Sequence, residues 1–331
     1  MDALPLSSHH QARLSLPPGY DRPVQPSQRR HALPITESWL TAWNRRHENP
    51  PEILYHYTDA KALYSIVDEN NTWATDAHHL NDTSELSYVD EVIHSVLATL
   101  IGAHHGRPSR SFLEAADMEL LDNLRKEWDI YITSFCTCGD QLSQWRGYSR
   151  TGGGYSIGFR AKDMLPSVPS SLLRLRCVIY ERSEQEKLVC EIFQGLCCWL
   201  ESLSSSQSNE LVCTHALLEA ARMLSECLFC LKNPGFSEER EWRLVHIVQA
   251  KLHLSHTPLH FRPTPAGLVP YVKLTPNGQQ PGVRGLLPID EVVVGPNPHP
   301  EEARNAMQCF LAHSCGGATV KVRNSTIPLR V

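Results

Sequence analysis

The sequence predicts an α+β fold with a mixed, mostly antiparallel sheet at its core and with helical insertions. Predicted strands and helices come in blocks along the 331 residues, whereas a parallel sheet of strand–helix units would require them to alternate. Hydrophobic residues make up 41% and charged residues 20%, an ordinary globular balance that excludes wholesale disorder. We see no internal repeat, so the pattern does not indicate a solenoid.

The chain divides into a tail and one domain. Residues 1–36 are rich in Ser, Pro, Arg and His and have almost no periodic apolar pattern, so we expect a flexible tail. Leu14, Leu16 and Tyr20 are the residues through which this tail would instead lie in a groove of the domain. Residues 37–331 are expected to form a single α+β domain.

The first half of the domain is predicted to start with a strand and a helix. Residues 53–57 form the strand, and Asp59 caps the helix, in which Leu63, Ile66 and Val67 share one apolar face. The later elements of this half are an extended stretch over residues 73–79, a helix that begins at the turn over 80–85, a helix over 112–127 and a strand over 130–135.

The second half is predicted to hold a helical insertion between strands. Two helices fill residues 183–231 and are separated by the Ser-rich linker 202–208. A polar loop is predicted over residues 139–153. The remaining predicted elements are strands over residues 155–159, 174–180, 242–248, 271–274 and 291–294, a helix over 301–311 and a strand over 319–322.

Composition limits the partners that we expect. The formal charge of −5 provides no global basic field for nucleic acid, although a local patch would not show in this number. The 11 cysteines lie in apolar runs and the chain is long enough to build its own core, so we expect no disulfide framework. Cys227-Leu228-Phe229-Cys230 has no second ligand pair at metal-binding spacing, so we expect no metal site.

Targeting signals are equally sparse. The sequence shows no charged-then-apolar leader and no apolar run of the ~20 residues that a membrane span needs. We therefore expect a cytoplasmic protein without a membrane partner, or one that is delivered into a host cytoplasm by a leaderless route.

Two dense clusters are the main candidates for function. Tyr55-His56-Tyr57-Thr58 closes the first predicted strand, and Glu238-Glu239-Arg240-Glu241-Trp242-Arg243 opens a later one. Alternation along the later strand places Glu239, Glu241 and Arg243 on one face. A histidine at the end of one strand and carboxylates at the start of a distant strand can converge on one cleft. Such a cleft suits a site that binds a nucleotide sugar and stabilises positive charge at its anomeric carbon. The ordinary alternative is a solvated run of charges.

Three further segments carry polar or aromatic groups. Gln144-Trp145-Arg146-Gly147-Tyr148 precedes three glycines and would either pack onto the domain or stack a ligand ring. Asn81 lies in a helix-starting turn, where an amide and a helix N-terminus together can seat phosphate or ribose. Gly154-Tyr155-Ser156-Ile157-Gly158 matches the serine-hydrolase elbow, but it alternates like a strand and follows a glycine-rich loop, so a nucleophilic Ser156 is disfavoured.

The order of these motifs carries a resemblance. The motifs are Tyr55-His56-Tyr57-Thr58, Leu80-Asn81-Asp82-Thr83-Ser84-Glu85, Ser134-Phe135, Gln144-Trp145-Arg146-Gly147-Tyr148, Gly154, Ile157-Gly158-Phe159, Lys232 through Phe236 and Glu239-Arg240-Glu241-Trp242-Arg243. Over roughly residues 53–295 they resemble the bacterial family catalogued as domain of unknown function 2971. That family usually has Met-Trp where this chain has Gln144-Trp145, and its name carries no settled activity.

A second resemblance implies an activity. The first strand, which ends in His56-Tyr57-Thr58 before a short helix, is similar to the opening of ADP-ribosyltransferases of the His-Tyr-Glu type. This implies an ADP-ribosyltransferase-like fold with NAD as the substrate. It also implies that His56 contacts the nicotinamide-side ribose and that a late glutamate orients this ribose and activates the acceptor. Glu241 matches that glutamate, and Glu239 matches it less well.

The mechanism that we expect assigns the remaining contacts to NAD. They are Tyr57, Thr58 and Asn81 as further binding residues, Tyr148 or Tyr155 stacked on the nicotinamide, and Arg146 or Arg243 at the pyrophosphate. An oxocarbenium-like state needs positioning and a nearby carboxylate more than covalent help from the protein.

The predicted function is therefore NAD-dependent ADP-ribosyl transfer, or NAD glycohydrolase activity if water is the acceptor, in a toxin, an effector or a phage-defence protein. The sequence does not name the acceptor. The alternative is a non-catalytic nucleotide-binding or protein-interaction module. His56 and Glu241 in one cleft would favour the enzyme, and Glu241 paired with Arg240 or Arg243 on an open surface would favour the module.

Overall fold

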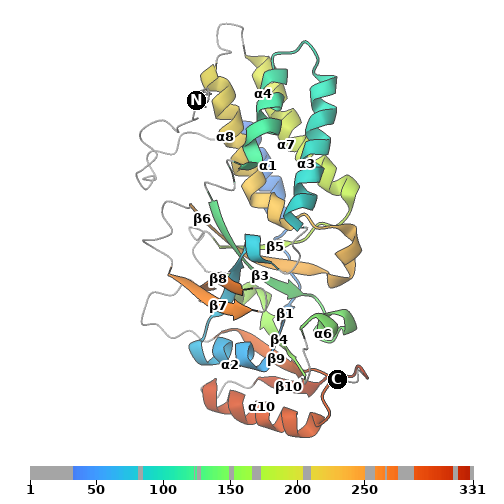
Figure 1. Ribbon diagram of the computed structural model, residues 1–331, viewed down its shortest axis with the longest axis vertical. Coiled ribbons are helices and arrows are strands. Elements are labelled where there is room, and N and C mark those ends of the chain that lie inside the picture. The colour runs from blue at the N-terminus through green and yellow to red at the C-terminus, as the bar shows by residue number, and fades with distance from the viewer. Residues whose placement is uncertain are drawn as a thin grey trace, which may run out of the picture.

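The computed structural model describes residues 33–80, 85–122, 124, 128–148, 153–165, 173–203, 210–249, 258–264, 267–274, 287–315 and 320–328. Five helices gather at one end of the molecule, the sheet lies in the middle, and two helices cover the other end (Figure 1). The first group is α1 (Pro34–Arg45), α3 (Glu85–Ala103), α4 (Arg110–Ala115), α7 (Arg182–Ser202) and α8 (Glu210–Cys227), and the second is α2 (Ala60–Glu69) and α10 (Pro300–Ser314).

Ten strands of the described chain form one sheet, in which the pairings between strands are antiparallel except that of β9 with β10. The strands are β1 (Ile53–Thr58), β2 (Thr72–Asp76), β3 (Trp128–Cys136), β4 (Tyr155–Arg160), β5 (Leu173–Cys177), β6 (Glu241–Gln249), β7 (Leu259–Thr264), β8 (Gly267–Leu274), β9 (Ile289–Val294) and β10 (Lys321–Asn324). This arrangement confirms the predicted α+β class and the mixed, mostly antiparallel sheet.

β3 is the strand that holds the sheet together. β6 pairs with it over its whole length, from Trp128 to Cys136, and so occupies one of its two edges. β1 and β2 share the other edge, where β2 pairs at Tyr131 and Ile132 and β1 pairs only at Cys136. The sheet therefore forks at residues 133–135 of β3, with β1, β4, β9 and β10 on one branch and β2, β8 and β7 on the other.

The helices and one strand differ in part from the prediction. α7 and α8 fill the predicted insertion over residues 183–231, and Asp59 caps α2 by accepting the N–H of Ala62 at 2.8 Å, as predicted. The first helix begins at Pro34, two residues before the predicted end of the tail. Residues 1–32 of that tail lie outside the described chain.

Helices α1 and α6 and strand β7 were not predicted. No helix was expected between the tail and the strand that begins at residue 53, where the structure has α1. Helix α6 (Leu142–Tyr148) lies in the stretch that the sequence presents as a polar loop, because Trp145 anchors a short helix that has few other apolar residues. β7 was missed because Pro263 and two polar residues interrupt its apolar pattern. The segment is a strand because it pairs with β8 over residues 259–264.

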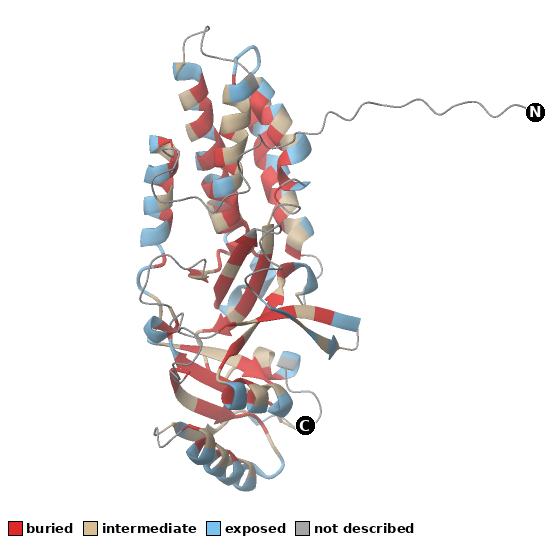
Figure 2. Cartoon of the chain, turned by 90° about the vertical axis from the view of Figure 1, so that its left-hand side faces the viewer, coloured by how far each residue is buried: buried red, intermediate tan, exposed pale blue. Residues whose placement is uncertain are grey.

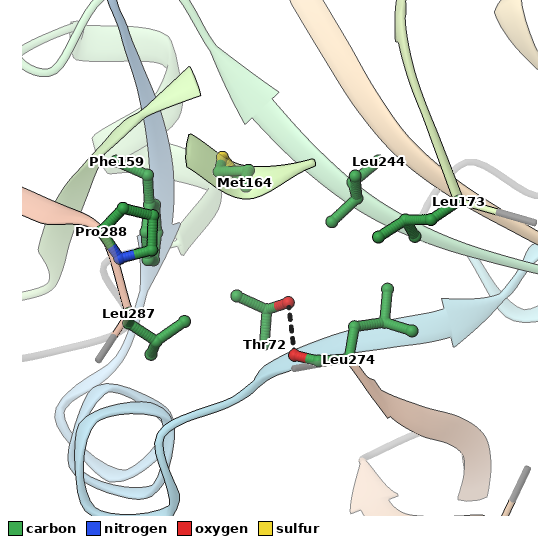
Figure 3. A pocket seen from close by; sticks show the side chains of 8 residues that line it. All are labelled: Thr72, Phe159, Met164, Leu173, Leu244, Leu274, Leu287 and Pro288. Carbon is green, nitrogen blue, oxygen red and sulfur yellow. Dashed lines mark hydrogen bonds between the residues drawn. The ribbon is translucent and has the colours of Figure 1, made fainter. Parts of the chain in front are cut away.

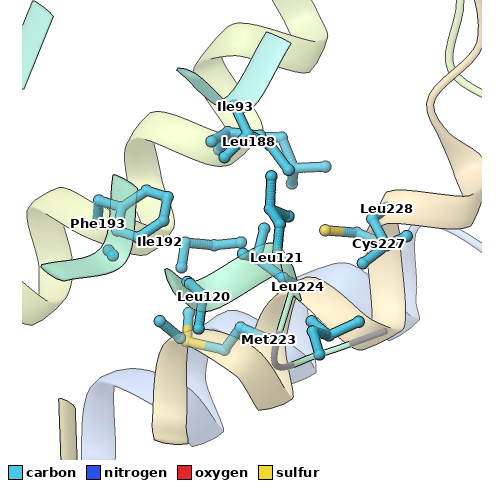
Figure 4. Close-up of a cluster of buried hydrophobic side chains, with 14 of the residues drawn as sticks. Ile93, Leu120, Leu121, Leu188, Ile192, Phe193, Met223, Leu224, Cys227 and Leu228 are labelled. Carbon is cyan, nitrogen blue, oxygen red and sulfur yellow. The ribbon is translucent and has the colours of Figure 1, made fainter. Parts of the chain in front are cut away.

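The sheet separates two hydrophobic cores. Because side chains alternate along a strand, Ile132 and Val245 face the group of five helices, whereas Phe135 and Trp242 face the other side. Figure 4 shows how α3, α7 and α8 fill the first core with aliphatic and aromatic side chains. Its labelled residues include Ile93, Leu188, Ile192, Phe193, Met223 and Leu224.

The second core lies between the two branches of the sheet and helices α2 and α10. Leu63 and Ile66 of α2 and Leu311 of α10 are at most 2% exposed there. In Figure 2 the strands are accordingly coloured mostly as buried, while the outer faces of the helices are exposed. Burial on both faces explains why residues 130–132 of β3 and 244–248 of β6 are mostly apolar and do not alternate with polar residues.

Helix α3 is the described helix whose length and composition would let it cross a membrane, with a mean hydropathy of 1.2 over an 18-residue window. Its Val89, Val92 and Ile93 pack in the first core, and each is at most 2% exposed. A core helix of a globular protein meets the same criterion, so this single helix is weak evidence for a membrane span.

His47 joins α1 to the edge of the sheet. It is 6% exposed, and its Nδ1 accepts a hydrogen bond of 3.1 Å from the N–H of Cys177 in β5. Its ring lies edge-on to the rings of Trp43 and Trp242, at centroid distances of 4.4 and 6.4 Å. Burial lowers the pKa of His47 to about 3, and the charges of two nearby arginines act in the same direction. This contact therefore requires the neutral imidazole.

We expect His47 to make the folded protein less stable as the pH falls from about 6.5 towards 3. Below pH 6.5 the unfolded chain binds a proton at this imidazole and the folded chain does not, so stability drops by about 1.4 kcal/mol per pH unit. His47→Gln retains an acceptor but has no titrating group, and urea unfolding at about pH 4.5 and about pH 7 measures the difference.

The exposed His299 provides the control, because its replacement by Gln changes no contact between α1 and β5. If His47→Gln lost as much stability as the wild type between the two pH values, the neutral imidazole would not be what joins α1 to β5.

Candidate functional site

His56 lies at the fork of the sheet. Its side chain bonds to a carbonyl of β3 that has no N–H group of β1 or β2 opposite it. Its Nδ1 lies 2.9 Å from the carbonyl oxygen of Ser134, in the stretch of β3 that pairs with neither β1 nor β2. The hydroxyl of Thr133 likewise donates to the carbonyl of Trp73 at 3.0 Å. Side chains thus satisfy backbone groups that would be left unpaired where the two branches separate.

The contact with Ser134 fixes the tautomer of His56. A carbonyl oxygen only accepts, so Nδ1 carries the proton and Nε2 carries the lone pair. Burial lowers the pKa of His56, and the charge of Arg262 adds to the effect, so the ring is neutral at pH 7. The residue is half-buried. A neutral ring of this tautomer can accept a hydrogen bond from a hydroxyl group such as that of a ribose.

Thr58 and Tyr155 share the sheet face of His56. The register of β1 and β4 pairs His56 with Ile157 and Thr58 with Tyr155, and alternate residues point to the same side. The Phe135 ring lies 5.8 Å from the His56 ring on that side. Three of the predicted site residues, His56, Thr58 and Tyr155, therefore lie together.

Tyr57 points to the opposite face and supports the neighbouring loop. Its hydroxyl donates to the carbonyl of Cys138 at 2.8 Å and accepts from the N–H of Gln141 at 2.9 Å. Its ring meets Trp145 edge-on, with centroids 4.7 Å apart, and both side chains are buried. Burial raises the pKa of Tyr57. The predicted role of Tyr57 in NAD binding is therefore corrected to a structural one.

Trp145 is likewise part of the framework. It is fully buried, and its Nε1 donates to Asp140 at 2.7 Å. Asp140 also accepts the N–H of Thr326 at 2.8 Å, so the loop is held against the end of the chain. The sequence left open whether this segment packs onto the domain or stacks a ligand ring, and the structure shows that Trp145 packs onto the domain. Arg146 is exposed on α6, whereas Asn81 and the side chain of Tyr148 lie outside what the structure describes.

Glu241 and Arg243 belong to a buried chain of five charges, which we call the charge cluster: Glu85, Arg243, Glu241, Lys232 and Glu239. Arg243 donates through Nε to Glu241 at 2.8 Å and forms an ion pair with Glu85. Lys232 Nζ lies 2.9 Å from Glu241 and 2.6 Å from Glu239. Side-chain exposure rises outward, from 1% for Arg243 and 5% for Glu241 to 27% for Glu239. Three carboxylates and two cations leave a net charge of −1.

The cluster holds Glu239 and Glu241 in different environments. Burial alone would raise the pKa of Glu241, but the charges of Arg243 and Lys232 outweigh it and lower this pKa to about 2. Burial and the charge of Glu241 together raise the pKa of Glu239, although Lys232 and Arg243 act in the opposite direction. Glu241 is therefore a permanent anion, and Glu239, at the accessible end, is the group that can exchange a proton.

Arg243 has no capacity left for a ligand. In addition to its two carboxylate partners, its Nη1 donates to the carbonyl of Phe229 at 2.7 Å. Burial and three partners remove it from the surface, so the predicted contact between Arg243 and a pyrophosphate is corrected to a structural role.

Ser134 connects His56 and Glu241 while keeping them on different sides. Its carbonyl accepts from His56, and its hydroxyl donates to Glu241. Cys136 pairs with both Tyr55 and Glu241, so Glu241 lies on the face opposite to that of His56. The predicted convergence of His56 and Glu241 on one cleft is therefore replaced by two linked sites, one on each face of β3.

Sequence reasoning included Glu85, Ser134 and Lys232 in its motifs but assigned none of them to the site. The signal that could have found Lys232 is charge balance, because one arginine on the buried face of a strand cannot neutralise both Glu239 and Glu241. Glu85 follows a helix-starting turn, and capping alone explains it at the sequence level.

The other candidate motifs have structural roles. Ser156 is fully buried inside β4, opposite Tyr57, so the G-x-S-x-G pattern does not form the turn between a strand and a helix that a nucleophile needs. Cys227 and Cys230 are buried at the end of α8 and in the turn that follows it. Within the described chain, no three His, Cys, Asp or Glu side chains are arranged to hold a metal ion.

Two small cavities lie away from the predicted residues. Thr72, Phe159, Met164 and Leu244 are among the residues that line the first, which lies between the branches of the sheet and is almost entirely apolar (Figure 3). Its volume of about 10 Å³ is at most the space of one water molecule. The second, of about 30 Å³, lies beside Cys315. Neither is a preformed nucleotide pocket.

Comparison with known proteins finds a similarity over part of the chain. Residues 144–244 match the model of a family described as protein of unknown function (DUF2971). Over this segment the chain resembles that family. The matched segment contains Lys232, Glu239, Glu241 and Arg243 of the charge cluster. No curated protein and no solved structure matches the chain.

We expect Glu241→Gln to destabilise the protein by about 3–5 kcal/mol, because it leaves Arg243 and Lys232 buried without their shared carboxylate. Glu239→Gln removes a partly exposed partner and should cost about 1 kcal/mol or less. Urea unfolding of the two variants compares them directly. Equal stability of Glu241→Gln and the wild type would show that the cluster does not depend on this carboxylate.

His56→Ala should lower the free energy of unfolding by about 1–3 kcal/mol, because the carbonyl of Ser134 loses its donor. Thermal melts with and without NAD test a second role. We expect the variant to lose any NAD-induced rise in Tm that the wild type shows. A variant that melts lower but keeps the full rise would restrict His56 to supporting the fork.

Proposed function

We propose that this protein cleaves the bond between nicotinamide and ribose in NAD and passes the ADP-ribosyl group to water or to a macromolecular acceptor. The observation that carries the proposal is the pair Glu239 and Glu241, which share one ammonium group and have pKa values moved in opposite directions. One permanent anion beside one proton-exchanging carboxylate is the arrangement that glycosidic cleavage uses.

The chemistry follows from the charges. The bond electrons leave with the nicotinamide ring, which becomes neutral, and positive charge develops on the ribose. The net charge of −1 on the cluster favours that cation. Glu239, as a carboxylate at the accessible end, accepts the proton of the attacking water or hydroxyl group. Glu241 keeps Lys232 in contact with Glu239, so it is a positioning residue. This assignment reverses the order in which the sequence ranked the two.

The fork offers a second, separate contact surface for a nucleotide, on the face of β3 opposite to the charge cluster. His56 offers a neutral imidazole with its lone pair on Nε2, Thr58 offers a hydroxyl, and Tyr155 offers a half-buried ring on the same face. Ser134 connects this surface to Glu241. In this proposal the protein works in a cytoplasm, its own or a host's, as a toxin, an effector or a phage-defence protein.

One observation favours a second candidate, a non-catalytic nucleotide-binding or protein-interaction module. Each of the five charges in the cluster already has a partner inside the protein, which is what a purely structural network requires. In that case the cluster supports the fold, and only the surface around the fork and the neighbouring loops makes contacts.

Release of nicotinamide from NAD by the purified full chain distinguishes the two. We expect Glu239→Gln to lower the rate by about 10²–10⁴-fold, because the proton acceptor is lost. The wild-type rate should rise with pH as Glu239, whose pKa is raised above its ordinary value of 4.5, loses its proton. Glu238→Gln is the matched control, since Glu238 is exposed and adjacent.

Two outcomes would contradict the proposal. If the folded wild type released no nicotinamide at any pH, the protein would be a module. If Glu239→Gln released nicotinamide as fast as the wild type, the reaction would not use this carboxylate.

A further inference from the structure

The hairpin of β7 and β8 carries an apolar surface that the fold leaves uncovered. Of the eight large hydrophobic side chains that are exposed in the described residues, three lie on this hairpin: Leu259, Phe261 and Leu268, at 38%, 58% and 69%. Figure 2 shows the hairpin projecting from the body of the molecule with its tip exposed. A concentration of this kind on a single element typically marks a contact surface.

The three side chains lie on one face of the hairpin. Leu259 and Phe261 are two residues apart in β7, and Leu268 pairs with Pro263, which continues the same alternation. The other face carries His260 and Arg262. β7 is therefore apolar on one side and basic on the other.

β7 also ends the sheet in the described part of the chain, because it pairs there with β8 alone. An edge strand presents backbone N–H and C=O groups on which an added strand can pair. Pro263 has no N–H to offer, so such pairing is confined to residues 259–262. The geometry suits a short extended segment.

The charges decide between the possible occupants of this edge. The N-terminal 32 residues carry four arginines and two aspartates, so they repel the basic face. A second copy would bring its own His260 and Arg262 against those of the first. Three exposed side chains also provide much less than the roughly 800 Å² per partner of a standard interface. Both occupants within this protein are thus disfavoured.

We propose that the edge of β7 binds an extended strand of another protein whose residues alternate between apolar and acidic. Backbone hydrogen bonds to β7 provide the affinity in such a mode, and the alternate side chains provide the specificity. The apolar residues of the partner cover Leu259 and Phe261, and its carboxylates meet His260 and Arg262.

The edge is connected to the fork. Arg262 donates to the hydroxyl of Thr75 in β2 at 2.9 Å, and its charge contributes to the lowered pKa of His56. A partner carboxylate beside Arg262 would offset that charge. Binding at β7 is nevertheless inferred from the hairpin alone and does not depend on NAD chemistry.

Two labelled peptides of eight residues test the inference, one alternating Glu and Val and the other alternating Lys and Val. Fluorescence anisotropy with the full chain measures their binding. We expect the Glu peptide to bind at least ten times more tightly than the Lys peptide. Phe261→Ser should weaken the Glu peptide by about ten-fold or more, and His260→Glu should reduce the preference for it. Leu211→Ser is the matched control, because it removes an equally exposed leucine on α8.

Several outcomes would overturn the inference. Equal binding of the two peptides, or no binding of the Glu peptide, would contradict the argument from charge. An equal loss of binding with Leu211→Ser would contradict the assignment of the site to the hairpin. A dimer that Phe261→Ser dissociates would assign the surface to a second copy. Tighter peptide binding after deletion of residues 1–32 would assign it to the tail.

Discussion

The burial of one guanidinium group organises the functional part of this protein. Arg243 is 1% exposed, and a charge so far from water is tolerated only if it is paired and fully hydrogen-bonded. Its partners come from three places: Glu85 at the start of α3, Glu241 two residues earlier in β6, and the carbonyl of Phe229 after α8. The helical insertion, the sheet and the segment before β6 are thus held together at one point. Lys232 and Glu239 extend this network to the surface.

The fork of the sheet imposes a second constraint. A strand that loses its neighbour exposes backbone groups, and here the side chains of His56 and Thr133 bond to the affected carbonyls. The same bond that satisfies Ser134 places the lone pair of His56 on Nε2. A structural requirement therefore produces a group of defined tautomer, and structural and binding roles can coexist in one residue.

The two sites meet at Ser134, which accepts from His56 through its backbone and donates to Glu241 through its side chain. Both bonds are made by one residue of β3, the strand with which β6 pairs over its whole length. The β7–β8 hairpin joins the same system through Arg262 and Thr75. Hydrogen bonds therefore join the fork, the charge cluster and the hairpin, although the fork and the charge cluster lie on different faces of the sheet.

The sequence by itself determined the α+β class, the positions of most strands, the cap at Asp59 and the grouping of polar and charged residues around His56 and Glu241. These features depend on local periodicity, capping and composition, which neighbouring residues in the chain express directly. It also indicated that Cys227 and Cys230 pack in the core, because both lie in an apolar run.

Only the tertiary structure decided what the candidate residues contact. Tyr57 and Trp145 could each have stacked a ligand. The hydroxyl of Tyr57 instead bonds to a loop more than 80 residues away in the chain. Trp145 bonds to Asp140, which is itself held by Thr326 near the end of the chain. Alternation placed Glu239, Glu241 and Arg243 together but could not supply Lys232 and Glu85, whose positions depend on how α3 and the helical insertion dock on the sheet. The faces on which His56 and Glu241 lie follow from the register of β1 and β6 on β3, and register is set by long-range pairing that no local pattern encodes.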